Sequence, residues 1–261
     1  MKAEFLKYIK SKKFLMMFIV LMILSIVQSV DTFYYTKIID FYHSDANPAF
    51  LSILSNNNNI KFTLILNWLM PIYLILSYCD KYNIERKHGM QNIYLTKMNR
   101  KKHFFVKMGI SFINPFILVG TPVLFSLLTN ISFLHGGSSF FGFETYSREQ
   151  LEIFEYYPME HPYITYLLYF LSFLVICGIL GCVCQSICII TRDNKISYVL
   201  CLILWMLYFT DSRFSVDATI SPFTFEYRLI DGIRGAVCFG VPAIIIIITA
   251  YIISMGRKDE I

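Results

Sequence analysis

The sequence predicts an all-α integral membrane protein with six transmembrane helices. Of the 261 residues, 56% are hydrophobic and 16% are charged, and the mean hydropathy is +0.55, which is far from a soluble composition. Several apolar stretches reach the roughly 20 residues that a helix needs to cross a bilayer core about 30 Å thick. Lys and Arg also gather in alternate connections. We therefore expect one polytopic domain covering residues 1–261.

The six predicted spans are the longest apolar runs between charged connections. They cover residues 14–30, 62–79, 104–128, 163–190, 196–209 and 236–255. The fifth run is only about 21 Å long as a helix, so it must use polar ends or thin the membrane locally.

The basic residues predict that both termini and the connection 80–103 are cytoplasmic, because positive residues are retained on that side. Five Lys lie among the first thirteen residues, and eight Lys and Arg lie within 81–107. The three predicted outer connections, 31–60, 129–162 and 211–234, hold only five such residues. Since topology explains the formal charge of +5, that charge gives no reason to expect nucleic-acid binding.

The first thirteen residues have the pattern of an amphipathic helix that lies on the inner membrane surface. Phe5, Leu6 and Ile9 can face lipid, while Lys2, Lys7, Lys10 and Lys13 can face lipid phosphates. The alternative is a basic flank of the first span with no structure of its own.

The outer connection 129–162 is acidic and aromatic. Glu149, Glu152 and Glu155 lie within a predicted short interfacial helix, and Arg148 is the only Lys or Arg of the connection. One hypothesis is that these Glu recruit cationic amphipathic peptides by charge. The alternative is a solvated cap whose aromatic residues lie at the interface. In the connection 211–234 we expect short helices that dip into the outer leaflet.

The chain shows no motif of an enzyme. No ionisable residue lies in the middle of a span, no HExxH or GxSxG motif occurs, and no Gly-rich phosphate loop is present. We therefore expect no catalysis and no cofactor in this chain, with any ATP hydrolysis on a separate subunit.

Small and polar residues inside the spans are expected to join helices. Cys177, Cys184 and Cys188 share one helix face and could be read as metal ligands, but close helix packing together with Gly178 and Gly181 is favoured, and no metal is expected. The buried amides are expected to form interhelical hydrogen bonds, and the span prolines to form kinks. These residues are Gln28, Asn67, Asn114 and Gln185, and Pro71, Pro115, Pro122 and Pro242.

The connection 80–103 is too long and too patterned for a simple turn. We expect a short helix, a break at Gly89, and a second helix running into the third span. Ile93, Tyr94 and Leu95 form an apolar insert that could press into the groove of a partner.

At this connection the sequence resembles the permeases of ABC-2 type exporters. That family carries Glu, then Gly after three residues, a Leu-Thr step, Arg, and a Lys that opens the third span. The matching positions are Glu85, Gly89, Leu95, Thr96, Arg100 and Lys107. The layout of an amphipathic start, six spans and a long cytoplasmic connection is also similar, most of all to small permeases of lantibiotic or bacteriocin self-protection.

The resemblance implies a permease in the bacterial cell membrane that works with a second permease, identical or homologous, and with cytoplasmic ABC ATPase subunits. Those subunits would bind ATP and Mg and would dock on a coupling helix. The residues implied in coupling are Glu85, Arg86, Gly89, Ile93, Tyr94, Leu95 and Arg100. The implied substrate is an amphipathic or antimicrobial peptide taken from the membrane. The competing hypothesis is a non-transport membrane protein, such as a sensor or assembly factor, whose basic connection binds another partner.

Overall fold

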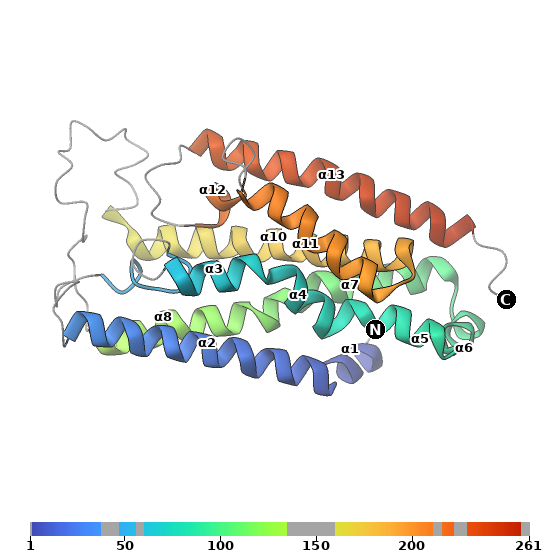
Figure 1. Cartoon of the computed structure of the whole chain (residues 1–261), viewed down its shortest axis with the longest axis horizontal. Helices are drawn as coiled ribbons and strands as arrows, with labels where there is room; N and C mark the ends of the chain where they lie inside the picture. The colour runs from blue at the N-terminus through green and yellow to red at the C-terminus, as the bar shows by residue number, and fades with distance from the viewer. Residues whose placement is uncertain are drawn as a thin grey trace.

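The computed structural model describes residues 2–37, 47–55, 60–134, 160–210, 216–221 and 229–256, and every regular element among them is helical. The helices run along the long axis of an elongated bundle (Figure 1). Four are long and apolar enough to cross a membrane, and a fifth span results if one bent pair is counted as a single crossing. The prediction of a helical protein with several helices able to cross a membrane is therefore confirmed for the described residues, which supply four or five such helices where six were expected. The further apolar helix, α11 (Asn194–Thr210), has only 17 residues.

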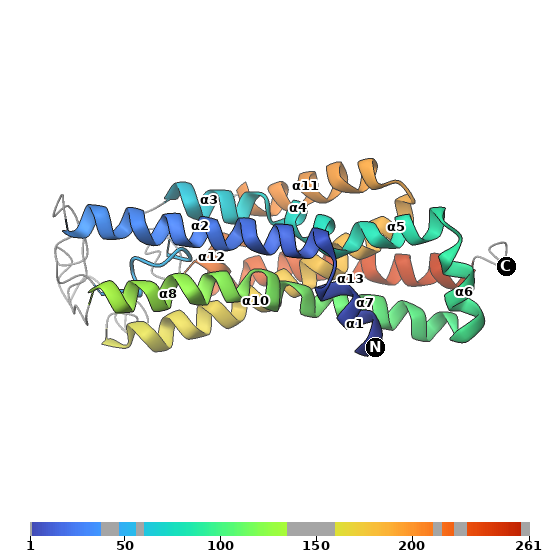
Figure 2. The same ribbon diagram turned by 90° about the horizontal axis from the view of Figure 1, so that it is seen from below.

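The first two helices differ from expectation in length. Helix α1 (Lys2–Ile9) is followed by α2 (Lys12–Lys37), which runs seven residues past the predicted end of the first span at residue 30. Helix α2 lies along α8 (Gly120–Leu134) in the turned view (Figure 2). The contacting face of α2 carries buried Gln28 and Ser29, and Ser29 hydrogen-bonds Thr129 of α8 over 2.7 Å. Polar side chains thus join these two helices.

The second predicted span is broken into four pieces: α3 (Ile60–Trp68), α4 (Met70–Leu74), the π-helix η1 (Ile75–Cys79) and α5 (Asp80–Lys87). The axis bends by 51° between residues 68 and 70. Pro71 explains the bend, because it has no N–H to donate to the carbonyl of Asn67 four residues before it. That carbonyl instead accepts the indole Nε1–H of Trp205 at 2.7 Å. The expected kink is therefore found at Pro71, and α11 satisfies the backbone carbonyl that the proline leaves free.

Helix α10 (Pro162–Thr191) is the centre of the bundle and contacts α4, η1, α5, α7, α11, α12 and α13. It packs most closely against α7 (Arg100–Leu118) through its glycines. A Cβ added to Gly181 would lie 2.3 Å from the carbonyl oxygen of Ser111, and one added to Gly178 would lie 2.8 Å from the Phe112 ring. Close packing by small residues is therefore confirmed at this interface.

The third predicted span is longer than expected. Helices α7 and α8 together form a spanning unit from Arg100 to Leu134, so the first six residues of the predicted connection 129–162 are helical. The sequence pattern ended the span too early because Thr129, Asn130 and Ser132 look like loop residues. In the structure these polar side chains bond to backbone carbonyls. Glu149, Glu152 and Glu155 lie outside the described residues.

The C-terminal helices fold back on the bundle. After α11, the short helix α12 (Asp217–Ile220) packs on α10 and on α13 (Leu229–Gly256). Thr219 donates a hydrogen bond to the carbonyl of Gly232 over 2.8 Å. A short helix in the connection 211–234 agrees with expectation, whereas α13 begins seven residues before the predicted residue 236.

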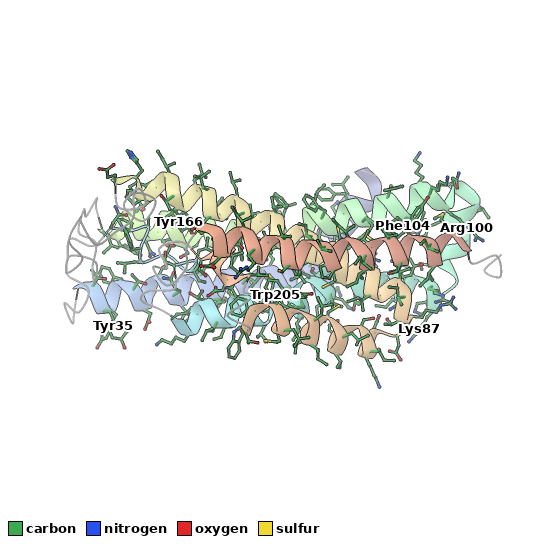
Figure 3. All side chains as sticks on the ribbon, turned by 90° about the horizontal axis from the view of Figure 1, so that it is seen from above. Tyr35, Lys87, Arg100, Phe104, Tyr166 and Trp205 are labelled. Atoms are coloured by element: carbon green, nitrogen blue, oxygen red, sulfur yellow. The ribbon has the colours of Figure 1, made fainter. Side chains whose placement is uncertain are left out.

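The two ends of the bundle are distinct. Figure 3 shows Lys87, Arg100 and Phe104 at one end, Tyr35 and Tyr166 at the other, and Trp205 between them. The basic end corresponds to the predicted cytoplasmic side. In intact cells, an impermeant thiol reagent is expected to label Asn57→Cys and Glu152→Cys but not Lys101→Cys, because the first two positions belong to predicted outer connections. Labelling of Lys101→Cys without permeabilisation would invert the topology.

Candidate functional site

The predicted coupling connection forms a helical unit at the basic end of the bundle. Helix α5 ends at Lys87, Gly89 adopts a left-handed φ of 69°, and α6 (Met90–Lys97) turns back toward α7. Gly89 is thus the break that the sequence predicted. A second break at residues 98–99 was not predicted, although Asn99 is a common helix N-cap and its side chain accepts the backbone N–H of Lys101 at 3.4 Å.

An ion pair lies inside this unit. Lys107 of α7 donates to Glu85 of α5 over 2.8 Å, with 1% and 7% of their side chains exposed. The second carboxylate oxygen of Glu85 lies 4.0 Å from the ammonium of Lys81, one turn earlier on α5. The Lys107 ammonium also lies over the rings of Tyr78 and Tyr94, 5.7 and 5.9 Å from their centroids. One buried cation therefore contacts η1, α5 and α6 at once.

Helix α6 is held to α7 by aromatic contact. The Tyr94 ring stacks on His103 with 6.0 Å between centroids, and Tyr82 of α5 lies 6.5 Å from the same imidazole. Around them Tyr82, Phe104 and Met108 form an apolar cluster with Ile189 and Ala250. These contacts connect α6 to the long helices α7, α10 and α13.

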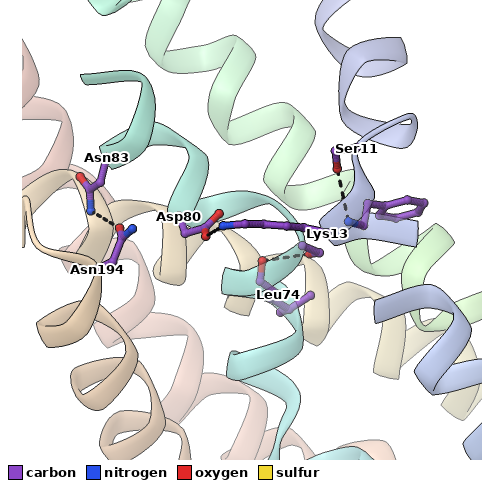
Figure 4. Close-up of polar contacts among 8 residues, drawn as sticks. Ser11, Lys13, Leu74, Asp80, Asn83 and Asn194 are labelled. Carbon is purple, nitrogen blue, oxygen red and sulfur yellow. Dashed lines mark hydrogen bonds and ion pairs between the residues drawn. The ribbon is translucent and has the colours of Figure 1, made fainter. Parts of the chain in front are cut away.

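Helix α5 is also tied to its neighbours by polar contacts (Figure 4). Asn83 donates to Asn194 at the start of α11 over 2.9 Å. Asp80 forms an ion pair with Lys13 at the start of α2. The sequence pattern predicted that Lys13 faces lipid phosphates. This prediction is corrected, because Lys13 pairs with Asp80. Such tertiary ion pairs join residues far apart in the chain, so spacing alone could not indicate this one.

The predicted coupling residues fall into two groups. Glu85 is buried and paired, so it positions the unit and is not part of its surface. Ile93 is 58% exposed and Met90 is 43% exposed, so these apolar side chains form the outer surface of α6. Arg86, Tyr94 and Arg100 are half-buried, and Gly89 is exposed. Leu95 lies on α6, but its side chain is outside the described part.

Tyr8 is a functional candidate that the sequence pattern missed. The amphipathic pattern assigned Phe5, Leu6 and Ile9 to one face, yet the fully buried side chain of α1 is Tyr8. Its hydroxyl donates to Asn114 of α7, whose amide donates to Ser77 of η1 over 2.8 Å. The N-terminal helix therefore contacts the π-helix through α7. π-Helical turns occur often at functional sites, and this one leads directly into α5.

The other span amides act as expected, with one exception. Gln28 bonds Ser126, and Ser111 bonds Gln185 over 3.3 Å. Asn67 differs, because its buried side-chain amide has no hydrogen-bond partner among the described residues. The seven cysteines are unpaired thiols, and no three His, Cys, Asp or Glu side chains in the described ranges are grouped as metal ligands.

Gly89→Val should disrupt the α5–α6 turn, because a β-branched residue is strained at a φ of 69°. The cost is expected to be about 1–3 kcal/mol. Gly89→Asn is the matched control, since Asn tolerates this conformation. Limited proteolysis between residues 87 and 100 measures the effect. Equal cleavage of the two variants would show that the left-handed turn is not required.

Comparison with known proteins leaves the family open. The chain is similar to the uncharacterized protein YybM of Bacillus subtilis (strain 168), with 22% identity over 262 residues that cover 100% of both chains. No family model and no solved structure matches the chain. The similarity thus extends over the full length of a protein whose printed name states no activity.

Proposed function

We propose that the chain is a permease subunit of an ATP-driven ABC exporter in the bacterial cell membrane. Two permeases would form the pathway, and two cytoplasmic ATPase subunits that bind ATP and Mg would dock on the α5–α6 unit. Both termini would be cytoplasmic. The proposed substrate is an amphipathic or antimicrobial peptide removed from the membrane.

The observation that carries the proposal is an exposed apolar helix fixed on a buried ion pair. Asn114 contacts α1, which is expected at the membrane surface, and Lys107 lies seven residues earlier on α7, or about 10 Å further toward the cytoplasm. Arg100 lies about 21 Å beyond Asn114 by the same rise. At that distance from lipid, contact with the membrane does not explain why the apolar side chains of Met90 and Ile93 are exposed. A protein partner with an apolar groove supplies one.

The helix breaks that precede α5 allow docking at α6 to move the membrane-spanning helices. Helices α3, α4, η1 and α5 follow one another with breaks between them. The helix axis bends by 51° between α3 and α4, and the π-helical turn at Ile75–Cys79 comes directly before α5. A discontinuous helix can change direction at its breaks, whereas a continuous helix resists bending. We expect closure of the ATPase subunits to push α6 and to rotate α5 about η1.

Ile93→Glu should abolish co-purification with a cytoplasmic P-loop ATPase, because a charge would be buried in an apolar groove. Thermal stability should change by less than about 0.5 kcal/mol, since the side chain is exposed. Phe105→Glu, at another exposed apolar position of this end, on α7, tests whether the docking surface extends beyond α6. Arg100→Ala should weaken the same association.

The result separates the two hypotheses for the basic connection. Association that survives Ile93→Glu would remove α6 as the docking site. Capture of no P-loop ATPase with the unaltered chain would favour the sensor or assembly-factor hypothesis.

A further inference from the structure

The described segment 47–55 is a buried, non-helical stretch at the end of the bundle opposite α6. The sequence assigned these residues to the outer connection 31–60, and in the structure all nine are buried. Gln28, which contacts the segment, belongs to the predicted span 14–30 and lies about 21 Å along the helix from the start of that span, so we expect the segment in the outer part of the bilayer core. Irregular backbone is tolerated at such depth only where protein or a polar cavity satisfies its peptide groups.

Side chains of three helices bind the backbone of this segment. The carbonyl of Leu51 accepts from the Gln28 amide at 2.7 Å and from the Asn130 amide at 2.9 Å. The neighbouring peptide groups are held as well. The N–H of Ile53 donates to Ser126 over 3.3 Å, and its carbonyl accepts from Thr63 over 2.8 Å. The binding groups are uncharged amides and hydroxyls that recognise peptide groups.

The remaining chemistry of the site suits apolar peptide. The segment buries Phe50, Leu51, Ile53 and Leu54, so the surroundings accept aliphatic and aromatic side chains. The Asn130 side-chain oxygen, in a residue 1% exposed, has no hydrogen-bond partner in the described ranges, which leaves one acceptor for a further N–H. Asn47, Ser52 and Ser55 hold the segment in a turn, so a peptide that adopts a similar turn could form the same backbone bonds to the helices.

We propose that residues 47–55 are a displaceable plug, and that the site beneath it binds an apolar peptide segment by its backbone. The choice of ligand rests on the proposed function. Exchange is feasible because each hydrogen bond lost by the plug is regained by the incoming peptide. When peptide is absent, the plug provides hydrogen-bond partners for Gln28, Ser126 and Asn130.

The position of the plug is measured with Ser52→Cys in the full-length chain in lipid nanodiscs. This side chain is 1% exposed, so an impermeant maleimide should react slowly with it. A synthetic peptide of Leu and Lys should raise the labelling rate at least tenfold. Gln28→Leu and, separately, Asn130→Leu should raise it without peptide, because each removes a donor to Leu51. Lys61→Cys, at an exposed position near the same end, gives the rate of an accessible thiol, and the unaltered chain gives the background of the native cysteines.

Backbone recognition is tested by the same peptide with N-methylated amides, which keeps the side chains but removes N–H donors. N-methylation leaves the carbonyls that accept from Gln28, Asn130 and Thr63 intact, and it removes the N–H groups that would donate to Ser126 and to the Asn130 side-chain oxygen. The concentration for half-maximal labelling should rise about threefold to tenfold for each of these N–H bonds lost. Equal potency of the two peptides would overturn backbone binding. If neither the peptide nor either Leu variant raises the labelling rate of Ser52→Cys, the segment is not a displaceable plug. The assay contains no ATPase, so its outcome is independent of whether an ATPase docks on α6.

Discussion

Lys107→Met is expected to lower the stability of the protein by about 3–5 kcal/mol, because it leaves the Glu85 carboxylate buried without its closest cation. For a chain of this size, that loss corresponds to a fall in Tm of roughly 6–20 °C. Lys81 is the remaining cation near Glu85, at 4.0 Å, so the lower part of this range is expected.

The double variant Glu85→Gln, Lys107→Met separates the pair from its surroundings. It removes both charges while keeping similar volumes, and we expect it to recover at least half of the lost stability. The measurement is thermal unfolding followed by a thiol-reactive dye, which reports when Cys79, Cys177, Cys184, Cys188 and Cys201 become accessible. Equal losses in the single and double variants would show that the buried charge is not the cause.

Gly181→Ala is expected to have the next largest effect. The new Cβ would lie 2.3 Å from the carbonyl oxygen of Ser111, so α7 and α10 would have to separate. Overpacking of this kind costs about 1–3 kcal/mol. The approach is close at this point because Pro115 gives no N–H to that carbonyl, which leaves it facing Gly181.

Two further glycines make the test specific. Gly178→Ala should cost less than Gly181→Ala, because its closest neighbour is the Phe112 ring, which can shift. Gly240→Ala on α13 meets no atom within 4 Å and should be neutral or slightly stabilising. The same dye assay applies. A loss in Gly240→Ala as large as in Gly181→Ala would show that helix packing is not the reason.

The connection 80–103 shows how far local pattern carried the prediction. The break at Gly89 was predictable because glycine adopts the left-handed conformation more readily than other residues. The exposed apolar side chain of Ile93 was predictable because it lies among charged residues. The inward direction of Glu85 was not predictable. On a short helix, the side chain that faces the bundle is decided by the helices that pack around it.

Composition and the positions of charges were enough to determine a helical membrane protein with a basic connection after the second apolar stretch. Hydrophobic burial in lipid depends on the length and content of each run, and both can be read along the chain. Tertiary structure alone decided the pairs Glu85–Lys107 and Lys13–Asp80, the link from Tyr8 to the π-helix, and the burial of 47–55. Each depends on groups 10 to 106 positions apart, which meet only when the helices pack. A buried polar group is stable only with its partner, so its role becomes visible only when the partner is in place.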